Sequence, residues 1–273
     1  MSVGTRGDME PFLAIGEMLK EEGHRVIIAL PEQFSDLVEG TGMEYASLGK
    51  RFIEMLESED GKAALGGSSS GFRKFLAMMK LAMKQTGINK ELVFRQHELI
   101  QKENPDRIVY NGKAIYPVIW EMKHPGKSVF VSPVPYIHYV KGHTHVAFNS
   151  NFGSLLNKLT FRLADFGMIM TTRISMKWLG ISAGYGRKQI KNAFSSRRSV
   201  YTISPTLFPG PDHWDEKISI LGYHDRNKSV SWSPEKELQE FIKRHESILF
   251  ITFGSMTNPE PEEKTRIFVD ILE

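Results

Sequence analysis

The sequence feature that most constrains the fold is the stretch Val3–Val26, in which a glycine turn is followed by an amphipathic segment. Gly4 and Gly7 favour a sharp turn, because glycine has no Cβ atom to collide with the backbone. Asp8 is expected as the N-cap of a helix whose apolar residues recur at helical spacing. The run at 25–30 is almost continuously apolar, which is typical of a parallel strand covered on both faces. The stretch therefore predicts a turn, a helix and a strand of a parallel α/β sheet.

Further apolar runs repeat this pattern along the chain. The sequence predicts strands at 43–48, 107–111, 128–131, 199–204 and 218–221, and helices at 31–39, 72–104 (divided near Gly87), 112–122, 154–179 and within 184–198. This alternation predicts a parallel sheet with right-handed crossovers. Ligands of such sheets bind at the carboxyl ends of the strands, so the turn that contains Asp8 lies at the expected ligand-binding edge.

The segment Gly222–Pro234 is polar and irregular, which is typical of an interdomain linker. After it we expect a helix at 235–243, a buried strand at 247–253, a second glycine turn and a last helix at 261–272. One βα unit cannot build a sheet of its own, so residues 234–273 are expected to be poorly supported.

Two motifs in this order resemble those of a known family. The first is Gly-Thr-Arg-Gly-Asp-x-x-Pro at 4–11, and the second combines Trp-x-Pro at 232–234 with Phe-Gly-Ser-Met at 253–256. Together they resemble the GT-B glycosyltransferases, in the branch of sterol and glycopeptide-antibiotic glycosyltransferases that has a family 28-type N-terminal domain. The resemblance covers nearly the whole chain, and two motifs in the right order are more specific than either alone.

The resemblance implies an α/β fold of the GT-B type. Residues 1–222 would form a Rossmann-like acceptor-binding domain, 223–246 a linker and helix, and 247–273 the start of a nucleotide-sugar-binding domain. The motif with which the family holds the donor would lie beyond Glu273. We therefore expect a fragment or a truncated gene product in which only the first βα unit of the second Rossmann-like domain is present.

The resemblance also implies a function, that of an inverting glycosyltransferase. A hexose would pass from a nucleotide-diphosphate sugar, expected to be a UDP-hexose, to a hydroxyl of a sterol, a lipid or another hydrophobic acceptor. Asp8 is implied as the general base, and its alternative role is a helix cap alone. The implied catalytic turn and diphosphate side comprise Gly4, Thr5, Arg6 and Gly7, and the implied donor-binding residues are Gly254, Ser255 and Met256.

The segment Pro133–Asn151 is long, aromatic and rich in histidine, and it begins at the same sheet edge as Asp8. The resemblance implies that this loop binds the acceptor, through Pro135, Tyr136, His138, His143, His145 and Phe148. No metal site is expected from the histidines, because no carboxylate lies in the loop to complete one. No cofactor is expected either, since backbone amides and a helix dipole can stabilise a leaving diphosphate.

Composition limits the partners. A net charge of +3 is too weak to indicate nucleic acid, and the absence of cysteine excludes disulfides and thiol nucleophiles. No uncharged apolar stretch is long enough for a membrane helix, so we expect a cytoplasmic protein with peripheral membrane contact if the acceptor is a lipid.

Three other functions fit part of the sequence. A nicotinamide-dependent oxidoreductase also uses a glycine turn, but Gly4-x-x-Gly7 lacks the third glycine of the dinucleotide fingerprint. A non-catalytic acceptor-binding fragment fits the incomplete donor domain. A sugar-nucleotide epimerase would share the donor without the acceptor. The sugar, the acceptor and the oligomeric state are not specified by these patterns.

Overall fold

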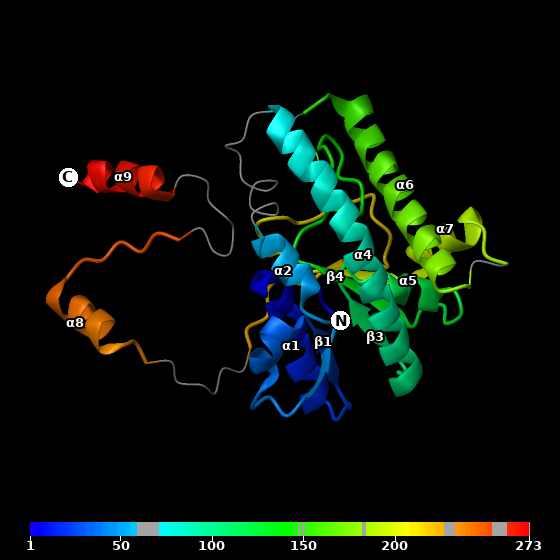
Figure 1. Ribbon diagram of the computed structural model, residues 1–273, viewed down its shortest axis with the longest axis horizontal. Helices are drawn as coiled ribbons and strands as arrows, with labels where there is room; N and C mark the ends of the chain where they lie inside the picture. The colour runs from blue at the N-terminus through cyan, green and yellow to red at the C-terminus, as the bar shows by residue number, and fades with distance from the viewer. Residues whose placement is uncertain are drawn as a thin grey trace.

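The computed structural model describes residues 1–58, 71–146, 148, 151–181, 184–226, 233–252 and 261–272, apart from the side chains of 71–84, 261 and 272. Its strands are β1 (Ile27–Leu30), β2 (Glu44–Ser47), β3 (Ile108–Tyr110), β4 (Ser128–Ser132), β5 (Arg198–Tyr201) and β6 (Ile218–Ile220). Its helices are α1 (Arg6–Glu21), the 3-10 helix η1 (Glu32–Val38), α2 (Arg51–Glu57), α4 (Gly71–Glu103), α5 (Tyr116–Glu121), α6 (Ser154–Trp178), α7 (Arg187–Ser196), α8 (Lys236–Arg244) and α9 (Pro261–Leu272) (Figure 1). This alternation confirms the α/β prediction.

The strands form two parallel sheets that the first residues of the chain join. β1 pairs with β2, and the second sheet has the order β3-β4-β5-β6. Between them lies the segment 1–3, where the Ser2 amide donates to the Ala29 carbonyl at 3.0 Å. On its other side the Asn111 amide donates to the Met1 carbonyl at 3.1 Å. The strands are therefore arranged as β2-β1-(1–3)-β3-β4-β5-β6, with the first segment at the centre.

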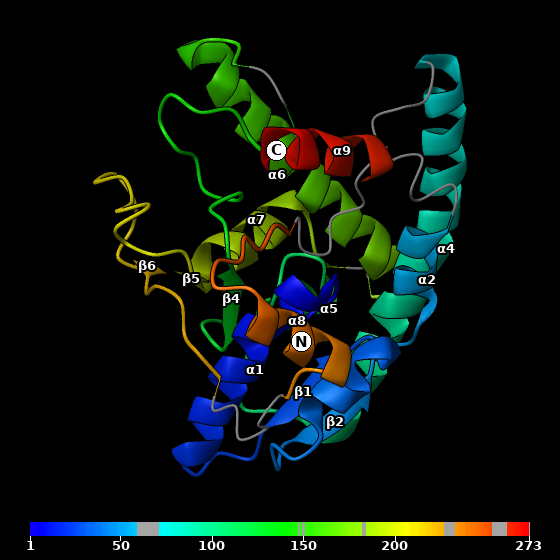
Figure 2. The same ribbon diagram turned by 90° about the vertical axis from the view of Figure 1, so that its left-hand side faces the viewer.

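β1 is covered on both faces, as its continuous apolar run predicts. On one face α1 and η1 contribute to a buried cluster of Met9, Leu13, Ile28, Leu30, Val38 and Met43. On the other face α2 and α4, which lie side by side in Figures 1 and 2, contribute to a cluster of Val3, Ala29, Leu48, Phe52, Ile53, Met55, Ile88 and Leu92. Alternate residues of one short strand therefore belong to two separate cores.

A third core lies between α4–α7 and the strands β3–β5. Its centre is an aromatic group contributed by three neighbouring strands, Tyr110, Phe130 and Tyr201, all fully buried. The Phe130 ring meets the Tyr110 and Tyr201 rings edge to face, with centroids 6.0 Å and 6.3 Å away. Edge-to-face contacts of this kind fix ring orientation, so the group forms a rigid floor beneath the loop that follows β4.

Two predictions about single elements are wrong. The helix predicted to divide near Gly87 is one continuous element, α4, of 33 residues. A single interior glycine costs a helix only about 1 kcal/mol, and Ile88 and Leu92 just beyond it are buried in the core, which holds the helix together. The strand predicted at 247–253 is not formed over its described residues, 247–252, and these are exposed. Phe250 is 82% exposed, because no neighbouring strand lies beside this segment to cover it.

The end of the described chain lies away from the body of the structure. Figure 1 shows α8 and α9 apart from the helices that surround the sheets. Both helices carry exposed apolar side chains, among them Leu238, Phe241, Ile242, Ile267, Val269 and Ile271. The expectation that residues 234–273 lack support is therefore met for the part that the structure describes.

This arrangement predicts a contrast in amide hydrogen exchange. Amides of 248–252 should exchange far faster than those of β1, because β1 is buried on both faces and hydrogen-bonded in a sheet. Exchange monitored by mass spectrometry on the native protein measures the difference. Equal protection of the two segments would contradict the arrangement.

Candidate functional site

The first turn of the chain, Gly4–Asp8, leads directly into α1. Helix α1 begins at Arg6 with Thr5 as its N-cap, so the prediction that Asp8 is the N-cap is wrong. Asp8 is the third residue of the helix, and its Oδ2 accepts a hydrogen bond from the Thr5 amide at 2.9 Å. This reciprocal form of capping fixes the carboxylate at the beginning of the helix, at the carboxyl end of the central segment.

Gly4 is required at its position and Gly7 is not. Gly4 has φ +144°, and a Cβ atom there would overlap the Asp8 carboxylate and approach the Lys113 Nζ to 2.7 Å. Gly7 lies within the first turn of α1, where a Cβ atom would meet nothing within 4 Å. The prediction that both glycines shape the turn therefore holds for Gly4 alone.

Lys113, which the sequence analysis missed, forms an ion pair with Asp8. Its Nζ lies 3.2 Å from Asp8 Oδ2, and the two side chains are 49% and 26% exposed. Lys113 follows β3, whose carboxyl end adjoins the first turn in this sheet order. The parallel topology was the available signal, because it brings the residues after neighbouring strands to one edge.

Asn111 holds the turn in place from the end of β3. Its Nδ2 donates to the Val3 carbonyl at 2.8 Å and to Ser2 Oγ at 3.0 Å. Its Oδ1 accepts from the amides of Val3 at 3.3 Å and Lys113 at 3.2 Å. Ser2 Oγ in turn donates to the Asp8 carbonyl at 2.7 Å. The buried Asn111 side chain is thus connected to both residues of the ion pair, to the Lys113 amide directly and to the Asp8 carbonyl through Ser2.

Tyr136 brings the loop after β4 to this turn. Its hydroxyl lies so close to Gly112 that a Cβ atom there would collide with it. Burial raises the pKa of Tyr136 to about 12, with a smaller contribution from the Asp8 charge that opposes the Arg197 charge. Tyr136 is therefore a neutral phenol beside the Asp8–Lys113 pair.

His138 and His145 lie in the same loop as Tyr136, and both pack against aromatic rings. His138 Nδ1 lies 2.7 Å from the Tyr201 hydroxyl, and the rings of Tyr201 and Trp214 flank it at 5.7 Å. Burial lowers the pKa of His138 to about 4, so it is neutral at neutral pH. The His145 ring packs edge to face with Tyr136 at 6.3 Å, and burial lowers its pKa too.

The remaining predicted residues lie farther from this group or outside the description. Pro135 is half-buried, His143 is exposed, and Phe148 packs against Phe152 with centroids 6.3 Å apart. Arg6 is 64% exposed and pairs with Glu10 at 3.2 Å. The predicted donor-binding residues Gly254, Ser255 and Met256 lie outside the described residues. Within the described part of the chain, no three His, Asp or Glu side chains gather as a metal site.

Arg226 fastens the beginning of the linker to α1. It pairs with Glu17 at 3.1 Å and Glu10 at 3.5 Å, and its Nη2 donates to the Leu37 carbonyl at 2.9 Å. The side chain is only 14% exposed, so these contacts are shielded from water. The predicted linker, which is polar and irregular in sequence, is therefore anchored near its beginning. Arg226 attaches it to α1, the helix that carries Asp8.

The sequence of this site has a family match. Residues 1–112, which contain the Gly4–Asp8 turn, Asn111 and β1–β3, match the family model described as "Glycosyltransferase family 28 N-terminal domain". The chain is thus similar to this family over residues 1–112. The matched segment contains Asp8 and Asn111, and Lys113 follows it directly.

Similar proteins extend the likeness over the whole chain. A sterol 3-beta-glucosyltransferase of Saccharomyces cerevisiae (strain YJM789) is 27% identical over 100% of this chain, and one of Arabidopsis thaliana is 24% identical over 99% of it. The chain spans 23% and 43% of the lengths of these two relatives. It is thus similar to one part of each.

Solved structures share the fold. The glycotransferase of kitacinnamycin matches with a TM-score of 0.50 and 16% identity, over 86% of this chain and 54% of that protein. The calicheamicin glycosyltransferase CalG4 matches with a TM-score of 0.50 and 16% identity, over 81% of this chain and 51% of that protein. The fold is accordingly of the GT-B type that the sequence motifs predict.

We predict that Asn111→Ala lowers the free energy of unfolding of the protein by about 2–3 kcal/mol, because it leaves the amide and carbonyl of Val3 without their partner. Urea unfolding measures the change. Asn192→Ala, on the exposed face of α7, is the control and should stay within about 0.5 kcal/mol. An Asn111→Ala protein as stable as this control would contradict the role of Asn111.

The lowered pKa of His138 predicts a loss of stability in acid. The unfolded histidine titrates near 6.5 and the folded one near 4, so the unfolded state binds more protons below pH 6.5. The contribution of His138 is therefore complete above that pH and is lost as the pH falls towards 4. Between pH 7.5 and pH 5 this amounts to about 2 kcal/mol, and His138→Asn should remove it from the measured pH dependence.

His143→Asn is the matched control for this measurement, since His143 is exposed in the same loop. Urea unfolding of the three proteins at pH 7.5 and pH 5 gives the comparison. An unchanged pH dependence in His138→Asn would show that this ring titrates normally.

Proposed function

We propose that this chain is the acceptor side of an inverting glycosyltransferase that moves a hexose from a nucleotide-diphosphate sugar to an alcohol. The observation that carries the proposal is the position of Asp8. Its carboxylate is fixed by the Thr5 amide and Lys113 at the ligand-binding edge of the sheet, beside the loop that contains Tyr136. The family 28 match and the sterol glucosyltransferase relatives support this choice over the oxidoreductase and the epimerase.

In the proposed reaction Asp8 acts as the general base. Within the described residues both contacts of the carboxylate go to Oδ2, so Oδ1 is the oxygen available to an acceptor hydroxyl. The acceptor oxygen attacks the anomeric carbon as Asp8 takes its proton, and the bond to the diphosphate breaks on the opposite face. The nucleoside diphosphate leaves with the electron pair, and the configuration inverts.

Lys113 has two roles in this scheme. It places an opposite charge 3.2 Å from the carboxylate, and its contact with Oδ2 leaves Oδ1 for the acceptor hydroxyl. Because the ion pair is partly exposed, its contribution to folding is small, on the order of 1 kcal/mol or less. Its effect is expected on the reaction rather than on stability.

The proposed donor is a UDP-hexose, with Gly254, Ser255 and Met256 at its diphosphate and with Arg6 and Gly7 facing the same group. Backbone amides at a helix N-terminus are suited to this task. The scheme needs no metal or other cofactor, because amides and a helix dipole supply the stabilisation of the leaving group.

The proposed acceptor is a sterol or another hydrophobic alcohol, held by the loop from Pro135 to Phe148. The relatives' names specify sterols as their acceptors. An exposed apolar stripe on α6 also favours a hydrophobic partner. The stripe consists of Leu155, Leu159, Leu163, Phe166 and Met170.

We also propose that this stripe reaches a membrane surface, as a cytoplasmic protein with a lipid acceptor would require. The exposed basic residues Lys158, Arg162, Arg173 and Lys177 share its helix, and such residues are attracted to anionic headgroups. None of the helices in the described part of the chain has the length and apolar character to cross a membrane.

Asp8→Asn tests the proposed function, in this chain extended by a nucleotide-sugar-binding domain, with a radiolabelled UDP-hexose and a sterol acceptor. Asn retains an oxygen for the Thr5 amide, so the melting temperature should change by no more than a few degrees. Loss of the base should lower kcat on the order of 10²–10⁴-fold. Asp106→Asn, at an exposed position before β3, is the control and should keep wild-type kcat.

Near-normal kcat in Asp8→Asn would contradict the role of Asp8 as the general base and would leave it only the role of capping α1. Absence of transfer even in the wild-type protein, with every donor and acceptor tried, would favour the non-catalytic acceptor-binding alternative.

A further inference from the structure

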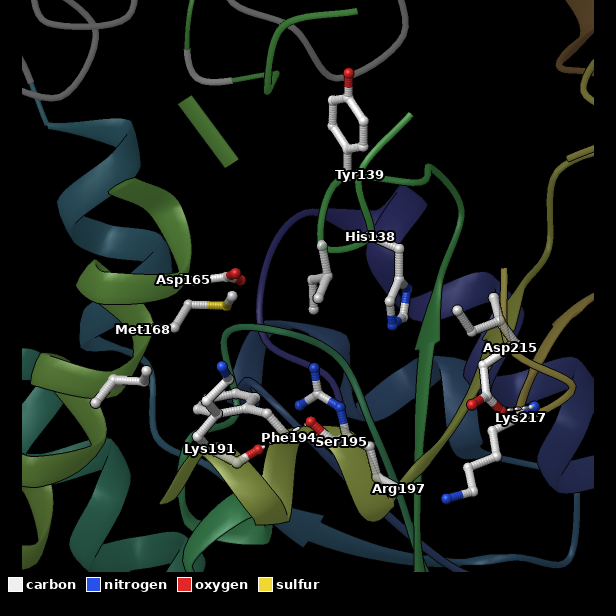
Figure 3. Close-up of a pocket in the computed structure, with 13 residues that line it drawn as sticks. His138, Tyr139, Asp165, Met168, Lys191, Phe194, Ser195, Arg197, Asp215 and Lys217 are labelled. Atoms are coloured by element: carbon white, nitrogen blue, oxygen red, sulfur yellow. Dashed lines mark hydrogen bonds between the residues drawn. The ribbon is translucent and has the colours of Figure 1, made fainter. Parts of the chain in front are cut away.

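A cavity of about 360 Å³ lies between α6, α7, the loop that follows β4 and the beginning of β6 (Figure 3). Its volume is within the range of small-molecule sites. None of its lining residues belongs to the Gly4–Asp8 turn, so it is separate from the ion pair described above. Its apolar lining consists of Ile137, Met168, Ile169, Phe194 and Ile218.

Arg197, which also lines this cavity, is a buried cation. The residue is only 3% exposed, and its guanidinium lies over the rings of Phe130 and Phe194, at 4.8 Å and 4.7 Å from their centroids. Nη1 donates to the Tyr110 hydroxyl at 2.7 Å. Nε and Nη2 have no hydrogen-bond partner among the described residues, and no carboxylate of that part of the chain pairs with the guanidinium.

The geometry of the two unpartnered N–H groups of Arg197, Nε and Nη2, indicates which acceptor they would bind. Leaving buried donors unpaired is unfavourable, more so for a charged group than for a neutral one. Nε and Nη2 lie along one edge of the planar guanidinium, where their N–H bonds run parallel. This fork matches the two oxygens of a carboxylate in a side-on, bidentate arrangement.

The other charges around the cavity leave it positive. Lys191 and Lys217 line it with Arg197, against Asp165 and Asp215, and His138 is kept neutral by burial. Figure 3 shows the guanidinium of Arg197 directed upward into the space, with the Lys191 side chain beside it. A single negative charge beside Arg197 would neutralise this set of five charged side chains.

We propose that this cavity binds a small carboxylic acid with an apolar body. Its carboxylate pairs side-on with Nε and Nη2 of Arg197, Lys191 supplies a second positive charge, and the body packs against Met168, Phe194 and Ile218. The two acidic side chains at the wall favour a ligand with a single charged end. Binding here does not depend on the proposed sugar transfer and is measured without a nucleotide sugar.

Calorimetric titration with octanoate, 1-octanol and inorganic phosphate tests the proposal in the wild-type chain. Octanoate should bind with one saturable site, and 1-octanol at least tenfold more weakly because it cannot pair with the guanidinium fork. Phosphate should also bind at least tenfold more weakly, because it has no apolar body.

Two pairs of variants locate the site. Arg197→Met should weaken octanoate binding at least tenfold, and Arg198→Met, at the adjacent exposed position, should leave it unchanged. On α7, Lys191→Met should weaken binding several-fold and Lys188→Met, which is exposed and does not line the cavity, should not. If Arg197→Met fails to fold, two comparisons still test the proposal. They are Lys191→Met against Lys188→Met, and octanoate against 1-octanol in the wild-type chain.

Four results would overturn the proposal. Equal binding of octanoate and 1-octanol would make the cavity merely apolar. Phosphate binding as tight as that of octanoate would show that the cavity recognises the negative charge and not the apolar body of the ligand. No saturable octanoate binding, or binding that survives in both Arg197→Met and Lys191→Met, would leave Arg197 as a structural cation stacked on aromatic rings.

Discussion

The structure depends on one buried amide, the side chain of Asn111. It hydrogen-bonds with both the amide and the carbonyl of Val3, and so joins the central segment of the chain to β3. The backbone contacts of Met1 and Ser2 also join the two sheets, and so does α4, which packs against α2 on one side and against α5 and α6 on the other. The geometry of the Gly4–Asp8 turn follows from the same side chain, because Ser2 connects it to the Asp8 backbone.

Two ionised groups of the structure stand in opposite environments. Asp8 is partly exposed and has an opposite charge, that of Lys113, at 3.2 Å. Arg197 is buried, has no carboxylate partner among the described residues, and is stabilised in part by aromatic faces. Because a buried charge is costly unless it is paired, the Asp8 pair is complete in itself, whereas the guanidinium points to a missing anion.

The loop after β4 connects these two environments. Tyr136 reaches Gly112 beside Asp8 and Lys113, while His138 lies on Tyr201 at the edge of the Arg197 cavity. Both side chains are held by the same aromatic floor, in which Phe130 touches the Tyr136 and Tyr201 rings. At either place, this loop therefore contributes a side chain, Tyr136 or His138, that is uncharged at neutral pH and packed against the aromatic floor.

The sequence by itself determined the alternation of strands and helices, the parallel sheet and the edge at which Asp8 lies, because these depend on local periodicity and on glycine conformation. It misassigned the N-cap and the role of Gly7, since a shift of three residues in the start of α1, from a cap at Asp8 to one at Thr5, leaves the apolar pattern unchanged. It also overvalued the apolar run at 247–252, because a strand forms only where neighbours offer hydrogen bonds.

Only the tertiary structure decided which residues surround Asp8 and which buried cation has no carboxylate partner among the described residues. Lys113 is 105 positions from Asp8, and Arg197 meets Tyr110 across 87 positions. No local pattern encodes such pairs. They arise because parallel strands bring the ends of distant segments to one edge, and because packed helices bury a charge that the sequence alone shows only as one arginine among many.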